Sequence, residues 1–169
     1  MRFLLTAVVF LVAGIIQTSL FEYIRIFDVV PNLFLVIVIC FSLLKEGLEG
    51  GFIGALGGII EDAVMAASLG LYTLLNTFLG ISIGLVNKRV VRENLFVSIF
   101  FVFIFSLIYE SIFYFVVFFF SGQQDILYAF NKIIIPESIY NAAITIIIFP
   151  LVIWIDMWVK EHARFARKY

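Results

Sequence analysis

The stretch 87-NKRVVREN-94, followed directly by 95-LFVSIFFVFIFSLIYESIFYFVVFFF-120, decides the fold of this chain. Its second part is 26 residues long and contains a single charged residue, Glu110. A bilayer core of roughly 30 Å needs about 20 apolar helical residues. This segment is therefore long enough to cross a membrane with some tilt. The basic residues just before it are typical of a cytoplasmic flank.

The rest of the chain repeats this arrangement of apolar runs and short charged gaps. The runs predict six membrane spans, at about 3–21, 31–44, 48–63, 69–87, 95–120 and 136–159. The 169 residues are 64% hydrophobic with a mean hydropathy of +1.17, and a soluble domain of this size could not bury so much apolar surface. We therefore predict one integral membrane domain over residues 1–169, an all-α bundle of six transmembrane helices.

The basic residues fall on alternate gaps. If the N-terminus is cytoplasmic, the cytoplasmic segments carry nine of the eleven Lys and Arg residues: Arg2, Lys45, Lys88, Arg89, Arg92, Lys160, Arg164, Arg167 and Lys168. The outer segments carry only Arg25 and Lys132. Because cytoplasmic loops carry an excess of Lys and Arg, we predict that both termini are cytoplasmic.

Local signals predict where the helices begin. The first run follows Arg2 as in a signal peptide, but no small-residue cleavage site comes after it, so we predict a retained helix. Proline suits the first turn of a helix, and Pro31 and Pro136 are predicted to open the second and sixth helices. Residues 121–135 are then predicted to form the longest outer loop, with an amphipathic stretch that could lie on the membrane interface.

The third predicted helix is rich in glycine. Gly50, Gly54 and Gly58 lie on one of its faces, and small residues four apart let two helix backbones approach closely in lipid. We interpret this face as a packing seam, either inside the bundle or against a partner. The run over 48–63 is short, so this helix is either a full span or a partly re-entrant element.

Glu110 lies deep inside the fifth predicted helix. An ionisable group there costs a few kcal/mol and is a candidate functional residue. The alternative is a carboxyl held by neighbouring helices for packing specificity. Asn76 and Asn141 are amides within spans; such groups bridge helices, and they are the candidate hydrogen-bond donors to Glu110.

Glu61 and Asp62 are adjacent acids at the end of the glycine-rich helix. Neighbouring residues point about 100° apart on a helix, so these two carboxyls do not readily face one ligand. A cation site would need further oxygen ligands, and none is evident. The pair is either a cation-binding element or a helix end at the membrane interface.

The common catalytic motifs are absent from the sequence. It contains no P-loop, HExxH, CxxC or GxSxG, and its one histidine, His162, lies in the basic tail. The single cysteine, Cys40, is predicted to pack within the second helix. We predict no catalytic residue, no cofactor, no metal and no nucleic-acid partner.

The most basic loop contains Lys88, Arg89 and Arg92. One interpretation is that these charges only orient the protein in the membrane. The other is that they also contact anionic lipid or a cytoplasmic partner.

Several short segments, taken in their order and spacing, resemble one family over nearly the whole chain. They are Pro31-Asn32-Leu33-Phe34-Leu35, Lys45-Glu46-Gly47, the run from Gly51 to Gly58 leading into Glu61-Asp62, Leu69-Gly70-Leu71-Tyr72, the basic loop from Lys88 to Arg92, Tyr109-Glu110, and Pro136-Glu137-Ser138-Ile139-Tyr140-Asn141. Together they are similar to the rod shape-determining protein MreD family.

The resemblance implies a non-enzymatic scaffold of the bacterial inner membrane that supports lateral peptidoglycan synthesis and cell shape. Members of that family associate with the bitopic protein MreC, and through it with MreB, RodA and a class B penicillin-binding protein. The family also resembles the S-components of ECF vitamin transporters in fold. The alternative function is therefore a small-solute transport subunit with a pocket near Glu61, Asp62 and Glu110. The sparse polar set favours the scaffold, because a solute site needs several convergent polar groups.

Overall fold

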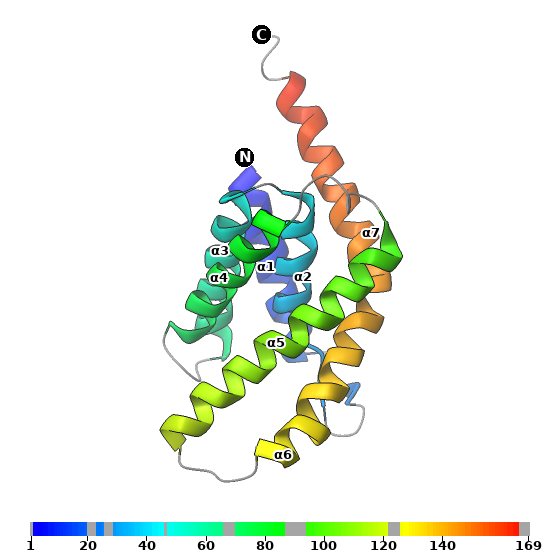
Figure 1. The fold of residues 1–169 in the computed structure, drawn as a ribbon. Helices are drawn as coiled ribbons and strands as arrows, with labels where there is room; N and C mark the ends of the chain where they lie inside the picture. Colours follow the sequence, from blue (N-terminus) through cyan, green and yellow to red (C-terminus); the bar gives the residue numbers. More distant parts are fainter. Residues whose placement is uncertain are drawn as a thin grey trace.

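Six helical segments run alternately in opposite directions in this computed structural model (Figure 1). The structure describes residues 2–19, 23–25, 29–45, 47–65, 70–86, 94–121 and 126–165. The elements are α1 (Arg2–Ser19), α2 (Leu33–Leu44), α3 (Glu49–Met65), α4 (Leu71–Val86), α5 (Leu95–Ser121), α6 (Ile126–Ala129), the π-helix η2 (Phe130–Ile134) and α7 (Ile135–Phe165). The described residues contain no strand, which confirms the predicted all-α class. The start of α1 and the end of α7 lie at the same end of the bundle (Figure 1).

The short helix α2 forms the centre of the bundle. Every residue from Leu33 to Leu43 is buried, and α2 contacts α1, α3, α4, α5 and α7. A helix that is apolar on all sides is stable only when other helices surround it, and that is the position of α2. Its 12 residues cover only about 18 Å, less than the roughly 30 Å of a bilayer core. Its first residue, Leu33, is buried, so α2 begins inside the protein.

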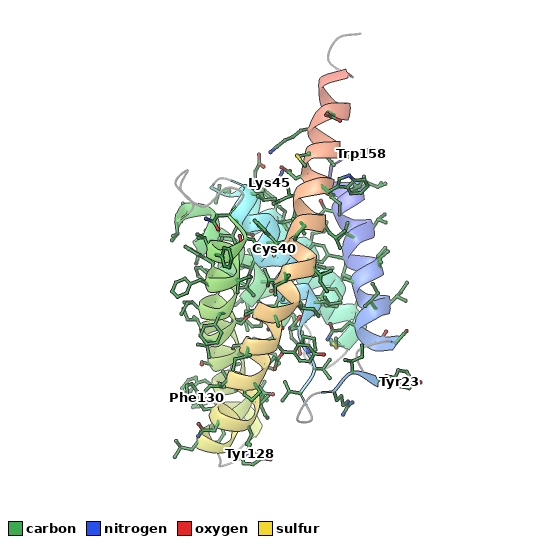
Figure 2. All side chains as sticks on the ribbon, turned by 90° about the vertical axis from the view of Figure 1, so that its right-hand side faces the viewer. Tyr23, Cys40, Lys45, Tyr128, Phe130 and Trp158 are labelled. Carbon is green, nitrogen blue, oxygen red and sulfur yellow. The ribbon has the colours of Figure 1, made fainter. Side chains whose placement is uncertain are left out.

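Two helices are long and apolar enough to cross a membrane, over Leu95–Phe119 and Leu127–Glu161. Shorter apolar helices cover Leu4–Ser19, Leu33–Leu44 and Leu71–Val86. Figure 2 shows Lys45 and Trp158 at one end of the bundle, and Tyr128 and Phe130 at the other. Tryptophan and tyrosine are enriched where a membrane protein meets the lipid head groups.

The last long helix starts earlier than predicted. It begins at Ile126 and continues through η2 into α7, whereas Pro136 was expected to open it after an outer loop. Inside η2 the Ile135 N–H donates to the Phe130 carbonyl, five residues earlier. A proline lacks an N–H and normally interrupts a helix. The wider π turn just before Pro136 lets the helix continue.

Candidate functional site

The glycine face of α3 packs directly on the backbone of α4. A Cβ atom on Gly50 would lie 2.3 Å from the carbonyl oxygen of Gly80, and one on Gly54 would lie 2.0 Å from that of Asn76. A Cβ on Gly58 would lie 2.4 Å from the Cα of Thr73. The three glycines therefore face α4 inside the bundle. In lipid, such close backbone approach gives the dispersion contacts that hold helices together.

The buried start of α2 is held by amide side chains from two other helices. The Asn32 N–H donates to Asn141 Oδ1 on α7 at 2.8 Å. From α1, Gln17 Nε2 donates to the Pro31 carbonyl at 2.9 Å and Gln17 Oε1 accepts from the Leu33 N–H at 3.0 Å. Backbone groups away from water must find partners within the protein, and these amides supply them.

Asn32 is the cap of α2 and the centre of this network. Its Oδ1 accepts the Leu35 N–H at 3.0 Å, the geometry of a helix N-cap. Its Nδ2 donates to Glu61 Oε1 on α3 at 2.9 Å. The helix thus begins at Leu33 behind an asparagine cap, and Pro31 precedes the cap instead of opening the helix. We had not expected this role for Asn32; the signal in the sequence was an asparagine just before an apolar run.

The two adjacent acids of α3 bind different partners. Glu61 is 1% exposed, and its Oε2 accepts from Asn76 Nδ2 on α4 at 2.6 Å. Asp62 accepts the N–H groups of Tyr72 and Thr73 at 3.2 and 3.0 Å, and the Thr73 hydroxyl at 2.5 Å. Asp62 therefore caps the start of α4, where an acid also complements the helix dipole. Both carboxyls are buried within the protein, and the described residues contain no cluster suited to a metal ion.

Glu110 is buried in α5 and lies against α7. Its carboxyl lies next to that of Glu137, close enough for the two to share a hydrogen bond when one of them is protonated. The expected amide donors are engaged elsewhere, because Asn76 donates to Glu61, and Asn141 donates to Ser106 Oγ at 3.2 Å. The structure thus gives Glu110 an acidic neighbour that the sequence did not predict, since residues 110 and 137 belong to different helices.

An ion cluster that we had not predicted lies at the other end of the bundle. Asp156 on α7 is 5% exposed and binds both Lys45 and Lys160, the latter at 2.5 Å. Asp156 and Lys160 are four residues apart, a spacing that favours ion pairs on a helix. Lys45 comes from the end of α2, so the cluster ties α2 to α7.

A cavity of about 280 Å³ lies beside this ion cluster. Its lining residues are Thr6, Phe41, Lys45, Glu49, Phe52, Ile53, Ile155, Asp156 and Val159. The alternative transport function would place a solute pocket near Glu61, Asp62 and Glu110; this cavity lies at the opposite end of the helices. The basic-loop residues Lys88, Arg89 and Arg92 lie outside the described residues.

These features define a class of protein: an all-helical bundle with apolar, membrane-length helices and a buried polar network that joins their ends. The sequence model of the family described as rod shape-determining protein MreD matches residues 1–159. The chain belongs to this family, as the sequence resemblance predicted. No curated protein and no solved structure matches the chain.

Proposed function

We propose that this protein is a non-enzymatic scaffold of the bacterial cell-elongation complex, which supports lateral peptidoglycan synthesis. Its family carries the role in rod shape determination. The observation that carries the scaffold proposal is the use of the buried polar groups. Asn32, Glu61 and Asp62 are bound to one another or to helix ends, so their hydrogen bonds serve the packing of helices.

The proposed partner is an MreC-like bitopic membrane protein, with MreB, RodA and a class B penicillin-binding protein linked indirectly. The outward surface of α5 supports a partner of this kind. Phe96, Phe100, Phe115 and Phe119 are exposed along it. In a membrane, such a surface contacts lipid tails or the apolar helix of another protein.

The proposed location is the bacterial inner membrane, with several spans and both termini in the cytoplasm. Two observations support this orientation: α1 begins and α7 ends at one end of the bundle (Figure 1), and Lys45 lies at that end too (Figure 2). The positions of the apolar runs assign nine of the eleven Lys and Arg residues to the same side. Anionic lipid heads attract basic segments by about 1 kcal/mol per charge, so membrane lipids are expected ligands of the basic loop and tail.

Co-purification tests the proposed function. The full chain with an affinity tag is extracted from membranes of its own cells in mild detergent, and the bound proteins are identified by mass spectrometry. An unrelated tagged multi-pass protein serves as the control. We expect specific recovery of an MreC-like protein. Recovery of a transport ATPase in its place would contradict the scaffold and favour the solute-transport alternative.

A further inference from the structure

A second polar cluster lies around Glu110, at the end of the bundle where α2 begins. Glu110 of α5 is 4% exposed and lies close enough to Glu137 of α7 for the two carboxyls to share a hydrogen bond when one of them is protonated. Glu61 of α3 is close enough to interact electrostatically with both carboxyls. Three acids from three helices therefore share one buried region.

Three buried atoms in this region have no hydrogen-bond partner among the described residues. They are Asn76 Oδ1, Glu110 Oε1 and the hydroxyl of Tyr109. Asn76 is 0% exposed and Tyr109 is 3% exposed. An unpaired polar atom in an apolar interior is unfavourable. The described side chains supply no hydrogen-bond partner for these three atoms.

The unpaired atoms define the chemistry of the missing group. An amide oxygen and an unprotonated carboxyl oxygen only accept hydrogen bonds, and a tyrosine hydroxyl does both. The missing group must therefore be a donor, and the neighbouring carboxyls favour one with positive charge. Lysine carries three donors and arginine five, and neither carries an acceptor.

The more accessible groups near Glu110 also favour a cation. Tyr72 and Tyr114 lie near Glu110 and Glu137, and these two tyrosines and Glu137 are partly exposed. Tyr72 stacks on Phe113 with their ring centroids 5.0 Å apart. The faces of aromatic rings attract cations. Lys45 and Lys160 bind Asp156 at the opposite end of the bundle and do not provide this cation.

We propose that Glu110, Glu137, Tyr109 and Asn76 form a binding site for one basic side chain carried by the membrane-spanning helix of a partner protein. A lysine or arginine within a membrane is costly unless it is paired, and this cluster would pair it. The proposal rests on the scaffold function to the extent that a partner helix must lie beside the bundle. It adds the chemistry by which the bundle would recognise that helix.

The test uses peptides of defined sequence. The full chain, with a fluorescent protein at its C-terminus, is reconstituted in phosphatidylcholine vesicles together with a labelled leucine-rich peptide of about 20 residues. One peptide carries a single central lysine and the matched peptide carries leucine at that position. Energy transfer gives both affinities. We expect the lysine peptide to bind at least tenfold more tightly, and equal affinities would overturn the proposal.

Variants of the chain show whether the acids cause this preference. We expect Glu110→Gln combined with Glu137→Gln to abolish it. The matched control Glu161→Gln, an exposed acid on α7, should leave it unchanged. A lysine preference that survives the double substitution would overturn the proposal.

If the doubly substituted chain does not fold, Tyr109→Phe decides, because it removes only the hydroxyl. A several-fold fall in the lysine preference supports the site, and an unchanged preference overturns it. The result is separable from the proposed function. Recovery of an MreC-like partner without any lysine preference would contradict this binding site and leave the scaffold function supported. A lysine preference without recovery of an MreC-like partner would support the site and contradict the scaffold function.

Discussion

Gly54 of α3 and Asn76 of α4 are in backbone contact, because a Cβ on Gly54 would lie 2.0 Å from the Asn76 carbonyl oxygen. The side chain of the same asparagine donates to Glu61 at 2.6 Å. The glycine seam and the polar network therefore meet at a single residue. A change that separates α3 from α4 should also break the hydrogen bond to Glu61.

Gly54→Leu should disrupt the bundle, because the leucine side chain has no space beside the α4 backbone. Overpacking of a well-packed core typically costs about 1–3 kcal/mol and occasionally more, and we expect the upper end of this range. Thermal unfolding in detergent and the level of protein in membranes measure the effect. The matched control is Ala63→Leu, on an exposed position of the same helix. Wild-type stability for Gly54→Leu would show that the seam is not essential.

Glu61→Leu should be strongly destabilising, because the Glu61 carboxyl accepts hydrogen bonds from two other helices or helix ends. The substitution leaves the Nδ2 groups of Asn32 and Asn76 without their acceptor, and each unpaired buried donor costs about 1–3 kcal/mol. Glu61→Gln keeps one oxygen acceptor and should be intermediate. Unfolding midpoints of the two variants test this order. Equal midpoints would mean that water or a rearranged side chain replaces the carboxylate.

Asp156→Asn should destabilise the junction of α2 and α7, because it removes the carboxylate that binds Lys45, whose side chain is only 12% exposed. Breaking a buried pair from one side costs about 3–5 kcal/mol. Lys45→Met in the same chain should restore much of this loss, since no uncompensated charge would remain. A double-mutant cycle of unfolding free energies gives the coupling. Strictly additive losses would rule out a direct interaction of the pair.

The orientation prediction is tested by cysteine labelling in intact cells, in a Cys40→Ala background. We expect a membrane-impermeant maleimide to modify Asp125→Cys and to spare Arg92→Cys, because residue 92 belongs to the basic cytoplasmic side. Both positions come from the sequence, since they lie outside the described residues. Labelling of 92 without 125 would reverse the orientation.

Two of the predicted runs, each ending in charged gaps, coincide closely with helices of the structure. The run 69–87 corresponds to α4 (Leu71–Val86), and 95–120 corresponds to α5 (Leu95–Ser121). The prediction failed at Pro136, where a π turn accommodates the proline and the helix extends back to Ile126. Local sequence preference alone favours a helix start at a proline. It does not predict the hydrogen bond from the Ile135 N–H to the Phe130 carbonyl, which forms the π turn.

The candidate polar residues were found by type, but their partners were not. Asn76, Asn141 and Glu110 were singled out because polar groups within apolar runs are costly. Which of them meet depends on the angular position and depth of each helix, and six helices allow many pairings. The network around Asn32 joins residues up to 109 positions apart in sequence, and no local pattern specifies such a pairing.

By itself, the sequence determined the helical class, the close-packing face of α3 and the family, because each depends on local periodicity or on the order of short segments. Only the tertiary structure decided that the 12-residue α2 is the buried centre and that Glu110 faces Glu137. It also decided that Asp156 joins Lys45 to Lys160. The sequence of an apolar helix does not show whether lipid or protein surrounds it. The surroundings are decided by which helices pack against it in the tertiary structure.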